Sequence, residues 1–158
     1  MMQETRYSPH IVYILRVLVG FQMVIGLAGG LIMVFDPTGK TLNLPGIFLL
    51  GTPFDDYLIP GLFLSLCVGL LPLLALLGLL GARWKWPELL NVYKRFHWGW
   101  SYTLYSAIVL ILWMDIQVFF IGYWHVAQTV NALMGVLILV ITLMPQVADH
   151  YRKEETDG

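Results

Sequence analysis

Charged residues are scarce in this sequence. Only 12% of its 158 residues are Asp, Glu, Lys or Arg, whereas about a quarter are charged in an ordinary soluble domain. Hydrophobic residues make up 58% of the chain, so too little charge remains to coat a soluble surface. The formal net charge of −1 offers no basic surplus. Nucleic acid would need a basic patch, and we expect no nucleic-acid partner.

Cysteine is almost absent. The single cysteine, Cys67, lies in an apolar run, so an intrachain disulfide, a CxxC pair and a thiolate zinc site are all excluded. We interpret it as a small packing residue. The sequence also lacks the H-E-x-x-H metal motif and the G-x-S-x-G nucleophile elbow. It therefore favours a non-enzymatic role with no metal and no cofactor, and it leaves catalysis open.

Long apolar runs are what the sequence has instead. A bilayer core of about 30 Å needs about 20 apolar residues in a helix, and backbone groups in lipid must be paired within the segment. We therefore predict a single-domain, all-α integral membrane four-helix bundle over residues 1–158. The first run is too long for a signal-peptide core, so we expect it to be a retained span. The four predicted spans are 11–35, 58–82, 98–123 and 126–146.

The basic residues indicate the orientation of these spans. Only Lys40 lies between the first and second runs. The other eight lie on the opposite side of the predicted spans: Arg6, Arg16, Arg83, Lys85, Lys94, Arg95, Arg152 and Lys153. Because Lys and Arg concentrate on the cytoplasmic side of a membrane protein, we predict that both termini are cytoplasmic and that residues 36–57 form an outer segment.

The outer segment has signs of defined structure. Asp36–Gly39 has the Asp, Pro and Gly spacing of a type I turn. Ile47–Leu50 is too apolar for a solvated loop, and we expect it to dip into the interface or pack on the bundle. Thr52 followed by Pro53 predicts a helix start. The segment also supplies three candidate site residues: Asp36, Asp55 and Asp56.

Three motifs give the sequence a family resemblance. Asp36–Gly39 is an Asp-Pro-Thr-Gly turn, Pro53–Gly61 reads Pro-Phe-Asp-Asp-Tyr-Leu-Ile-Pro-Gly, and Trp113 stands four residues before Gln117. With these motifs the chain, from about Gly29 to Pro145, resembles a widespread family of small prokaryotic four-span membrane proteins. The resemblance implies a four-span fold in a prokaryotic cytoplasmic membrane, and it implies no activity. Asp115 lies outside that shared pattern.

An aspartate interrupts the third apolar run, "ILWMDIQVFF". Asp115 lies eight residues before Tyr123, which is about 12 Å along a helix and in the outer half of the bilayer. A charged Asp at the centre of a span costs about 2.5–3.5 kcal/mol. Such residues usually face the bundle interior. We expect the same of Asp115, with Gln117 close by.

The fourth run begins with a polar face. His125, Gln128, Asn131 and Gly135 recur at spacings of three, three and four, which places them on one side of a helix. We therefore predict a cluster of Asp115, Gln117, Gln128 and Asn131, with His125 at its mouth near the outer-segment aspartates. Two interpretations stay open: a ligand or proton site, and hydrogen bonds that only join helices.

The cytoplasmic segment 83–100 mixes basic and aromatic residues. Leu89, Leu90, Tyr93 and Phe96 recur at helical spacing, which predicts an amphipathic helix along the inner leaflet. Its role is either anchoring at the interface or recognition of anionic lipid.

The first run contains a G-x-x-x-G motif, formed by Gly26 and Gly30. The missing side chains permit close helix contact. That contact could lie within the bundle or between protomers, and the sequence does not choose between them.

Three functions fit these features. The first is a non-enzymatic binding or assembly module for a partner protein, lipid or small ligand at its outer half. The alternative is an oligomeric transporter or channel for a small molecule, ion or proton that uses Asp115. A redox or lipid-modifying enzyme is the third, although the Cys pairs of quinone-using four-span enzymes are absent. The partners we expect are the lipid bilayer and either a membrane protein or further copies of this chain.

Overall fold

Four long helices dominate the computed structural model, which describes residues 9–153. Three are continuous: α1 (Pro9–Phe35), α4 (Trp98–Ile121) and α5 (Val126–Leu143). The second span joins α2 (Leu58–Phe63), η2 (Leu64–Leu70) and α3 (Leu71–Leu79). All four are long and apolar enough to cross a membrane, and the described residues contain no strand. The predicted all-α fold is confirmed, although the last three spans end slightly earlier than predicted.

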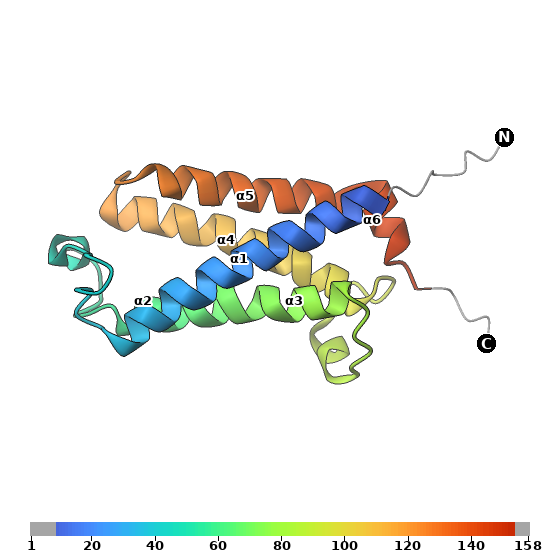
Figure 1. The fold of residues 1–158 in the computed structure, drawn as a ribbon, viewed down its shortest axis with the longest axis horizontal. Helices are drawn as coiled ribbons and strands as arrows, with labels where there is room; N and C mark the ends of the chain where they lie inside the picture. Colours follow the sequence, from blue (N-terminus) through green and yellow to red (C-terminus); the bar gives the residue numbers. More distant parts are fainter. Residues whose placement is uncertain (1–8, 154–158) are drawn as a thin grey trace.

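The four spans pack as a bundle (Figure 1). α1 packs on the second span, the second span packs on α4, and α4 packs on α5, which also contacts α1. The start of α1 and the short helix α6 (Pro145–His150) lie at one end, here called the terminal end. Residues 36–57 and 122–125 lie at the opposite end, here called the distal end.

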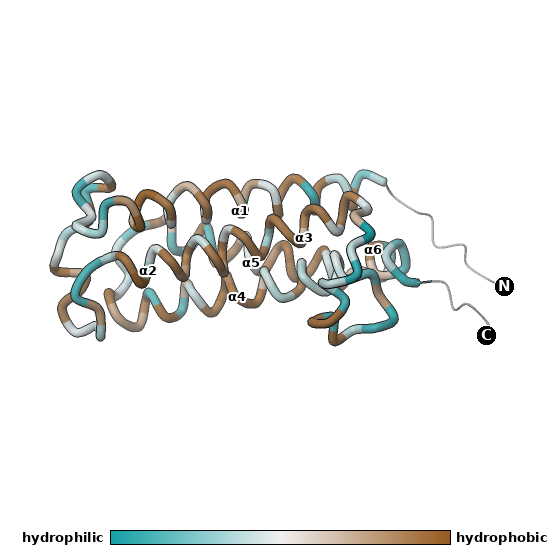
Figure 2. Tube along the Cα trace, turned by 90° about the horizontal axis from the view of Figure 1, so that it is seen from below, coloured by the Kyte–Doolittle hydropathy of each residue, from teal (hydrophilic) through white to brown (hydrophobic). Residues whose placement is uncertain are grey.

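The bundle exposes many large apolar side chains and buries several polar ones. Phe21, Leu66 and Phe119 are all exposed, whereas Gln22 and Ser106 are buried. Hydrophobic colour runs along the helices and hydrophilic colour gathers towards the two ends (Figure 2). Because lipid solvates apolar side chains, a membrane bundle joins its helices through small and polar residues. This distribution is that of a multi-pass membrane protein.

The G-x-x-x-G motif is used within the bundle. A Cβ added to Gly26 would lie 2.2 Å from the carbonyl oxygen of Val68, and one added to Gly30 would lie 2.3 Å from Ser65 Oγ. Both distances are too short for any side chain. The motif therefore brings α1 against the second span of the same chain.

The second span changes its helical pitch before a proline. Pro72 has no N–H, and its ring clashes with the carbonyl of residue 68 in a regular α-helix. η2 is a π-helix that directly precedes α3, at whose start Pro72 lies. The wider π turn gives the ring room. The disturbance expected at Pro72 is thus a local change of pitch.

The predicted amphipathic helix in segment 83–100 is wrong. Only a five-residue 3-10 helix forms, η3 (Trp86–Leu90). Buried Asn91 follows it, and its Nδ2 donates to Glu88 Oε2 (2.9 Å) and to the Phe96 carbonyl (3.0 Å). Ser101 Oγ donates to Asn91 Oδ1 (2.6 Å). This one amide folds the loop back on itself, which an extended interfacial helix would not allow.

The helix predicted to start at Thr52 is also wrong. Thr52 Oγ1 accepts a hydrogen bond from the Phe54 N–H (3.3 Å), which closes a turn instead. α2 begins at Leu58, whose N–H donates to Asp56 Oδ1 (2.9 Å). Tyr57 is the N-cap and makes no side-chain cap bond, so Asp56, one residue earlier, accepts from the first helical N–H. Residues 44–57 remain a folded loop.

Candidate ligand pocket at the distal end

A pocket of about 380 Å³ lies at the distal end. It is enclosed by residues 44–57 on one side and by the distal ends of the four spans on the other. Its volume falls within the range of small-molecule sites. The residues that line it are Met33, Leu44, Phe48, Leu49, Thr52, Phe54, Tyr57, Pro60, Trp113, Ile116, Gln117, Phe120, Ile121, Trp124, His125 and Gln128.

Tyr57 fixes the loop that covers the pocket. Its ring is buried, its Oη donates to the Pro45 carbonyl (2.8 Å), and its N–H donates to the Pro37 carbonyl (3.0 Å). Gly39 has a φ of 74°, and a Cβ there would lie 2.7 Å from the Tyr57 ring. The predicted turn at Asp36–Gly39 is confirmed, and it holds the loop over the bundle.

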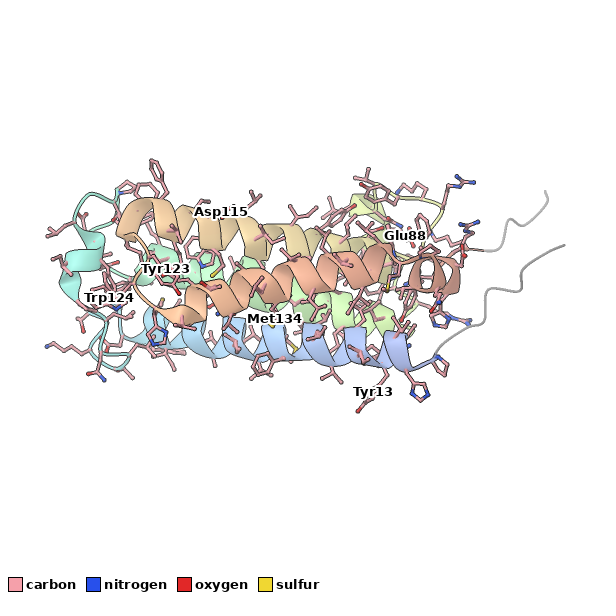
Figure 3. The ribbon with its side chains drawn as sticks, turned by 90° about the horizontal axis from the view of Figure 1, so that it is seen from above. Tyr13, Glu88, Asp115, Tyr123, Trp124 and Met134 are labelled. Atoms are coloured by element: carbon pink, nitrogen blue, oxygen red, sulfur yellow. The ribbon has the colours of Figure 1, made fainter. Side chains whose placement is uncertain are left out.

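An aromatic pair closes the top of the pocket. Phe48 lies in η1 (Gly46–Leu49) and meets Trp124 edge to face, with ring centroids 4.9 Å apart. Trp124 lies at the distal end beside this loop (Figure 3). Ile47 and Leu50 are 64% and 72% exposed, so the apolar run turns two side chains outwards. The expected packing of this run on the bundle is observed through Phe48.

His125 and Gln128 cap α5. His125 Nδ1 accepts from the Ala127 N–H (3.0 Å), while Gln128 Oε1 accepts from the N–H groups of Trp124 (2.9 Å) and His125 (3.2 Å). Gln128 Nε2 also donates to the Gly122 carbonyl (3.3 Å). These three bonds occupy the carbonyl oxygen and one N–H of the Gln128 amide. His125 carries its proton on Nε2 because Nδ1 accepts, so it keeps one donor at the pocket.

The Gln117 amide lines the pocket without a partner among the described residues. Within residues 9–153 its amide makes no hydrogen bond, and it is only partly buried. Nearby, Trp113 stacks on Phe63 with centroids 4.5 Å apart. Trp113 Nε1 is buried and finds no acceptor among the described residues. The pocket thus combines apolar walls with one free amide.

The predicted polar cluster does not form. Asp115 is exposed, on α4 (Figure 3), and does not line the pocket. It shares an outward stripe with Ile108, Leu112 and Phe119. Asn131 Nδ2 donates to the Ala127 carbonyl of its own helix (2.8 Å). Of the five predicted residues, the structure brings together Gln117, His125 and Gln128.

The predicted outer aspartates have local roles. Asp36 Oδ1 and Oδ2 accept hydrogen bonds from the backbone and hydroxyl groups of Thr38 and Thr41, which lower the pKa of its carboxyl to about 2. Asp55 and Asp56 are exposed, and Asp56 Oδ1 accepts from the N–H of Leu58 at the start of α2. None of the three lines the pocket. Among the described residues, no group of three His, Cys, Asp or Glu could hold a metal ion.

The aromatic lining was missed by reasoning from the sequence. Phe48, Phe54, Tyr57 and Trp124 all face the pocket, and all come from loops or helix ends. A signal was present: aromatic and aliphatic residues recur through segment 44–57, where a solvated loop would carry polar ones. The predicted site was chosen instead from the polar residues within the apolar runs.

Comparisons with known proteins add no relative. No protein-family model, no curated protein and no solved structure matches this chain.

Proposed function

We propose that this chain is a membrane binding protein whose distal pocket takes an apolar small molecule with one polar end. The observation that carries the proposal is the pocket itself: an aromatic-lined cavity of about 380 Å³ with a free Gln117 amide. Apolar walls with few, placed polar groups are typical of ligand sites. The walls would bury the apolar body, and the Gln117 amide and His125 Nε2–H would bind the polar end.

The lining favours binding over catalysis. It contains one imidazole, that of His125, and no carboxylate, amine or thiol. The Tyr57 and Thr52 hydroxyls already donate to the Pro45 and Leu49 carbonyls. A general acid–base pair or an activated nucleophile needs two reactive groups in contact. The described lining offers neither arrangement, so we assign it a non-enzymatic role.

The bilayer is the natural source of such a ligand. Ile116 and Phe120 line the pocket and are also exposed on the lipid-facing surface of α4. A molecule dissolved in the membrane would reach the pocket along this side without crossing water. A medium-chain alcohol or a lipid-like molecule fits the chemistry of the site.

Photolabelling tests the proposal. Purified protein in mild detergent would be irradiated with a diazirine derivative of octanol, and the labelled residues would be mapped by mass spectrometry. We expect labels on the lining, Ile116 and Phe120 included, that unlabelled octanol competes away. Native mass spectrometry of the same sample would show whether a molecule of fixed mass is purified with the protein.

Two variants and a control make the test specific. Trp124→Ala opens the top of the pocket and Gln117→Leu removes the polar anchor, so both should reduce labelling. Phe119→Ala is the control, because Phe119 is 82% exposed and does not line the pocket. Labelling that is spread over all spans, or that falls equally in the control, would refute the proposal.

A second candidate function is assembly through α4, and Asp115 favours it. Its exposed carboxylate lies within a span and has no partner among residues 9–153. A lipid-facing charge of this kind is costly unless another helix pairs with it. A further copy of the chain would supply such a helix, and a transport path would need one. Asp115→Leu should then lower the oligomer mass in native gels, with Asp55→Leu as the control; equal masses would exclude it.

We also propose that the protein resides in a prokaryotic cytoplasmic membrane with its terminal end in the cytoplasm. The support is the distribution of charge. Among the described residues, Lys40 is the only cation of the distal end. Six exposed or partly exposed cations beyond Arg16 lie at the terminal end: Arg83, Lys85, Lys94, Arg95, Arg152 and Lys153. This asymmetry follows the positive-inside rule.

A further inference from the structure

We propose that a pocket at the terminal end binds a phosphate group. The pocket has a volume of about 320 Å³ and lies between α1, the end of α3 and the residues that follow α6. Its lining includes Arg16, His97, His150, Arg152 and Lys153. It is separate from the distal pocket, and the proposal does not depend on the function assigned there.

Arg16 is the central residue of this pocket, because its charge has no counterion among residues 9–153. Its Nη2 donates to the Leu79 carbonyl (2.7 Å) and to Tyr151 Oη (3.3 Å), which are both neutral oxygens. Its Nε is buried and has no acceptor among the described residues. Among the described residues, no carboxylate lines the pocket. A partly buried guanidinium normally pairs with an anion, and none is supplied by this part of the chain.

Two more cations stand beside Arg16. Arg152 pairs with Asp149 (2.7 Å) and Lys153 pairs with Glu88 (3.0 Å), and both carboxylates lie outside the lining. These pairs leave the Arg16 charge uncompensated. Burial is the main cause of the lowered pKa of His150, and repulsion by the Arg16 cation adds to it. An anion in the pocket would relieve this repulsion.

Phosphate suits the site better than a simple point anion. An arginine fork binds phosphate oxygens through paired hydrogen bonds, and the Nε and Nη1 groups of Arg16 make no hydrogen bond to the described residues. Basic pockets between membrane helices bind anionic headgroups. The exposed Leu80 beside the pocket would contact an acyl chain. The phosphate could belong to a phospholipid headgroup or to a soluble phosphate, and an experiment separates the two.

The test compares an anionic with a zwitterionic phospholipid, and phosphate with chloride, on the purified full chain. Native mass spectrometry would measure binding of phosphatidylglycerol and of phosphatidylcholine in mild detergent. Thermal unfolding would be followed with inorganic phosphate and with chloride at equal ionic strength. We expect phosphatidylglycerol to bind about tenfold more tightly than phosphatidylcholine, the ratio that about 1.4 kcal/mol provides. Stabilisation by inorganic phosphate alone would identify the soluble source.

Variants decide whether Arg16 is responsible. Arg16→Gln should abolish the preference for phosphatidylglycerol over phosphatidylcholine. Lys40→Gln also removes one positive charge, but at the distal end, and should keep that preference. Arg16 also binds the end of α3, so Arg16→Gln could unfold the bundle; the double variant R152Q/K153Q spares that bond and should weaken binding several-fold. Three results would overturn the proposal. The first is no preference for phosphatidylglycerol over phosphatidylcholine together with none for phosphate over chloride. The others are an equal loss of preference in Lys40→Gln and unchanged binding in the double variant.

Discussion

The two ends of the bundle are built by different kinds of contact. At the terminal end, hydrogen bonds join residues far apart in the sequence: Arg16 reaches Leu79 and Tyr151, and Lys153 reaches Glu88. At the distal end most bonds are local. Asp36 holds Thr38 and Thr41, and Gln128 holds the backbone just before it.

This difference separates an end joined by bonds between distant residues from an end held mainly by local contacts. Bonds between distant residues lock α1, α3 and the last residues into one unit at the terminal end. The distal loop is held to the spans by the contact of Phe48 with Trp124 and by its own turns. The long-range hydrogen bonds and the aromatic-lined pocket thus lie at opposite ends of the bundle.

The largest effect should come from the contact between α3 and α4 on which both ends depend. A Cβ on Gly99 would lie 2.4 Å from the Gly78 carbonyl carbon. Gly99→Val therefore forces the helices apart and should lower stability by about 3 kcal/mol, at the upper end of overpacking costs. Thermal unfolding in detergent measures this. Gly46→Ala is the matched control, because nothing lies within 4 Å of that added Cβ; equal losses would contradict the account.

Asn91→Ala should have the next largest effect and act at the terminal end. It removes the amide that binds Glu88, Phe96 and Ser101. Buried partners are then left without hydrogen bonds, which should lower stability by about 2 kcal/mol. Trypsin should then cut faster after Lys94 and Arg95. Val92→Ala, at an exposed neighbouring position, should change neither the stability nor the rate of cleavage. Unaltered cleavage in Asn91→Ala would show that the loop does not depend on this amide.

Gln128→Ala should act at the distal end alone. The capping box of α5 is lost, and a lost cap costs about 1–2 kcal/mol. Because His125 and Trp124 line the pocket, octanol photolabelling should fall together with stability, while phosphatidylglycerol binding at the terminal end should persist. Gln146→Ala, at an exposed position, serves as the control. Loss of both binding activities would mean that the two ends are coupled.

The smallest effect should be a pH dependence at Asp36. Hydrogen bonds from Thr38 and Thr41 lower the pKa of its carboxyl from 3.8 to about 2. A lowered folded-state pKa contributes stability that is present above pH 3.8 and is lost as pH falls towards 2. Asp36→Asn should make the unfolding temperature depend less on pH between 3.8 and 2. Asp55→Asn should leave this pH dependence unchanged. If the unfolding temperatures of wild type and Asp36→Asn vary identically with pH, the Asp36 hydrogen bonds do not stabilise the folded protein.

The spans could be predicted because lipid imposes a length and a composition. Runs such as 98–123 need only apolar residues in a sufficient number, and α4 begins at Trp98 as expected. The rotation of α4 about its axis could not be predicted. Its apolar residues surround the helix, so hydropathy marks no inner face. Small residues such as Ser106 and Ala107 decide it, and Asp115 is left facing outwards.

The pocket could be predicted only in part. Gln117, His125 and Gln128 were identified because polar residues stand out in apolar runs. The cover of the pocket depends on contacts between distant residues, such as Phe48 with Trp124, and spacing within one segment does not reveal these. The loop at Asn91 was missed for the same reason, because Ser101 and Phe96 had to be placed before the amide could bind them.

Labelling of single cysteines tests most directly whether the two ends face opposite sides of the membrane, as the account claims. In a Cys67→Ser background, Asp55→Cys would mark the distal end and Lys94→Cys the terminal end, both at exposed positions. We predict that a membrane-impermeant maleimide labels Asp55→Cys in intact bacterial cells and labels Lys94→Cys only after permeabilisation. Labelling of both in intact cells, or the reverse order, would contradict the account.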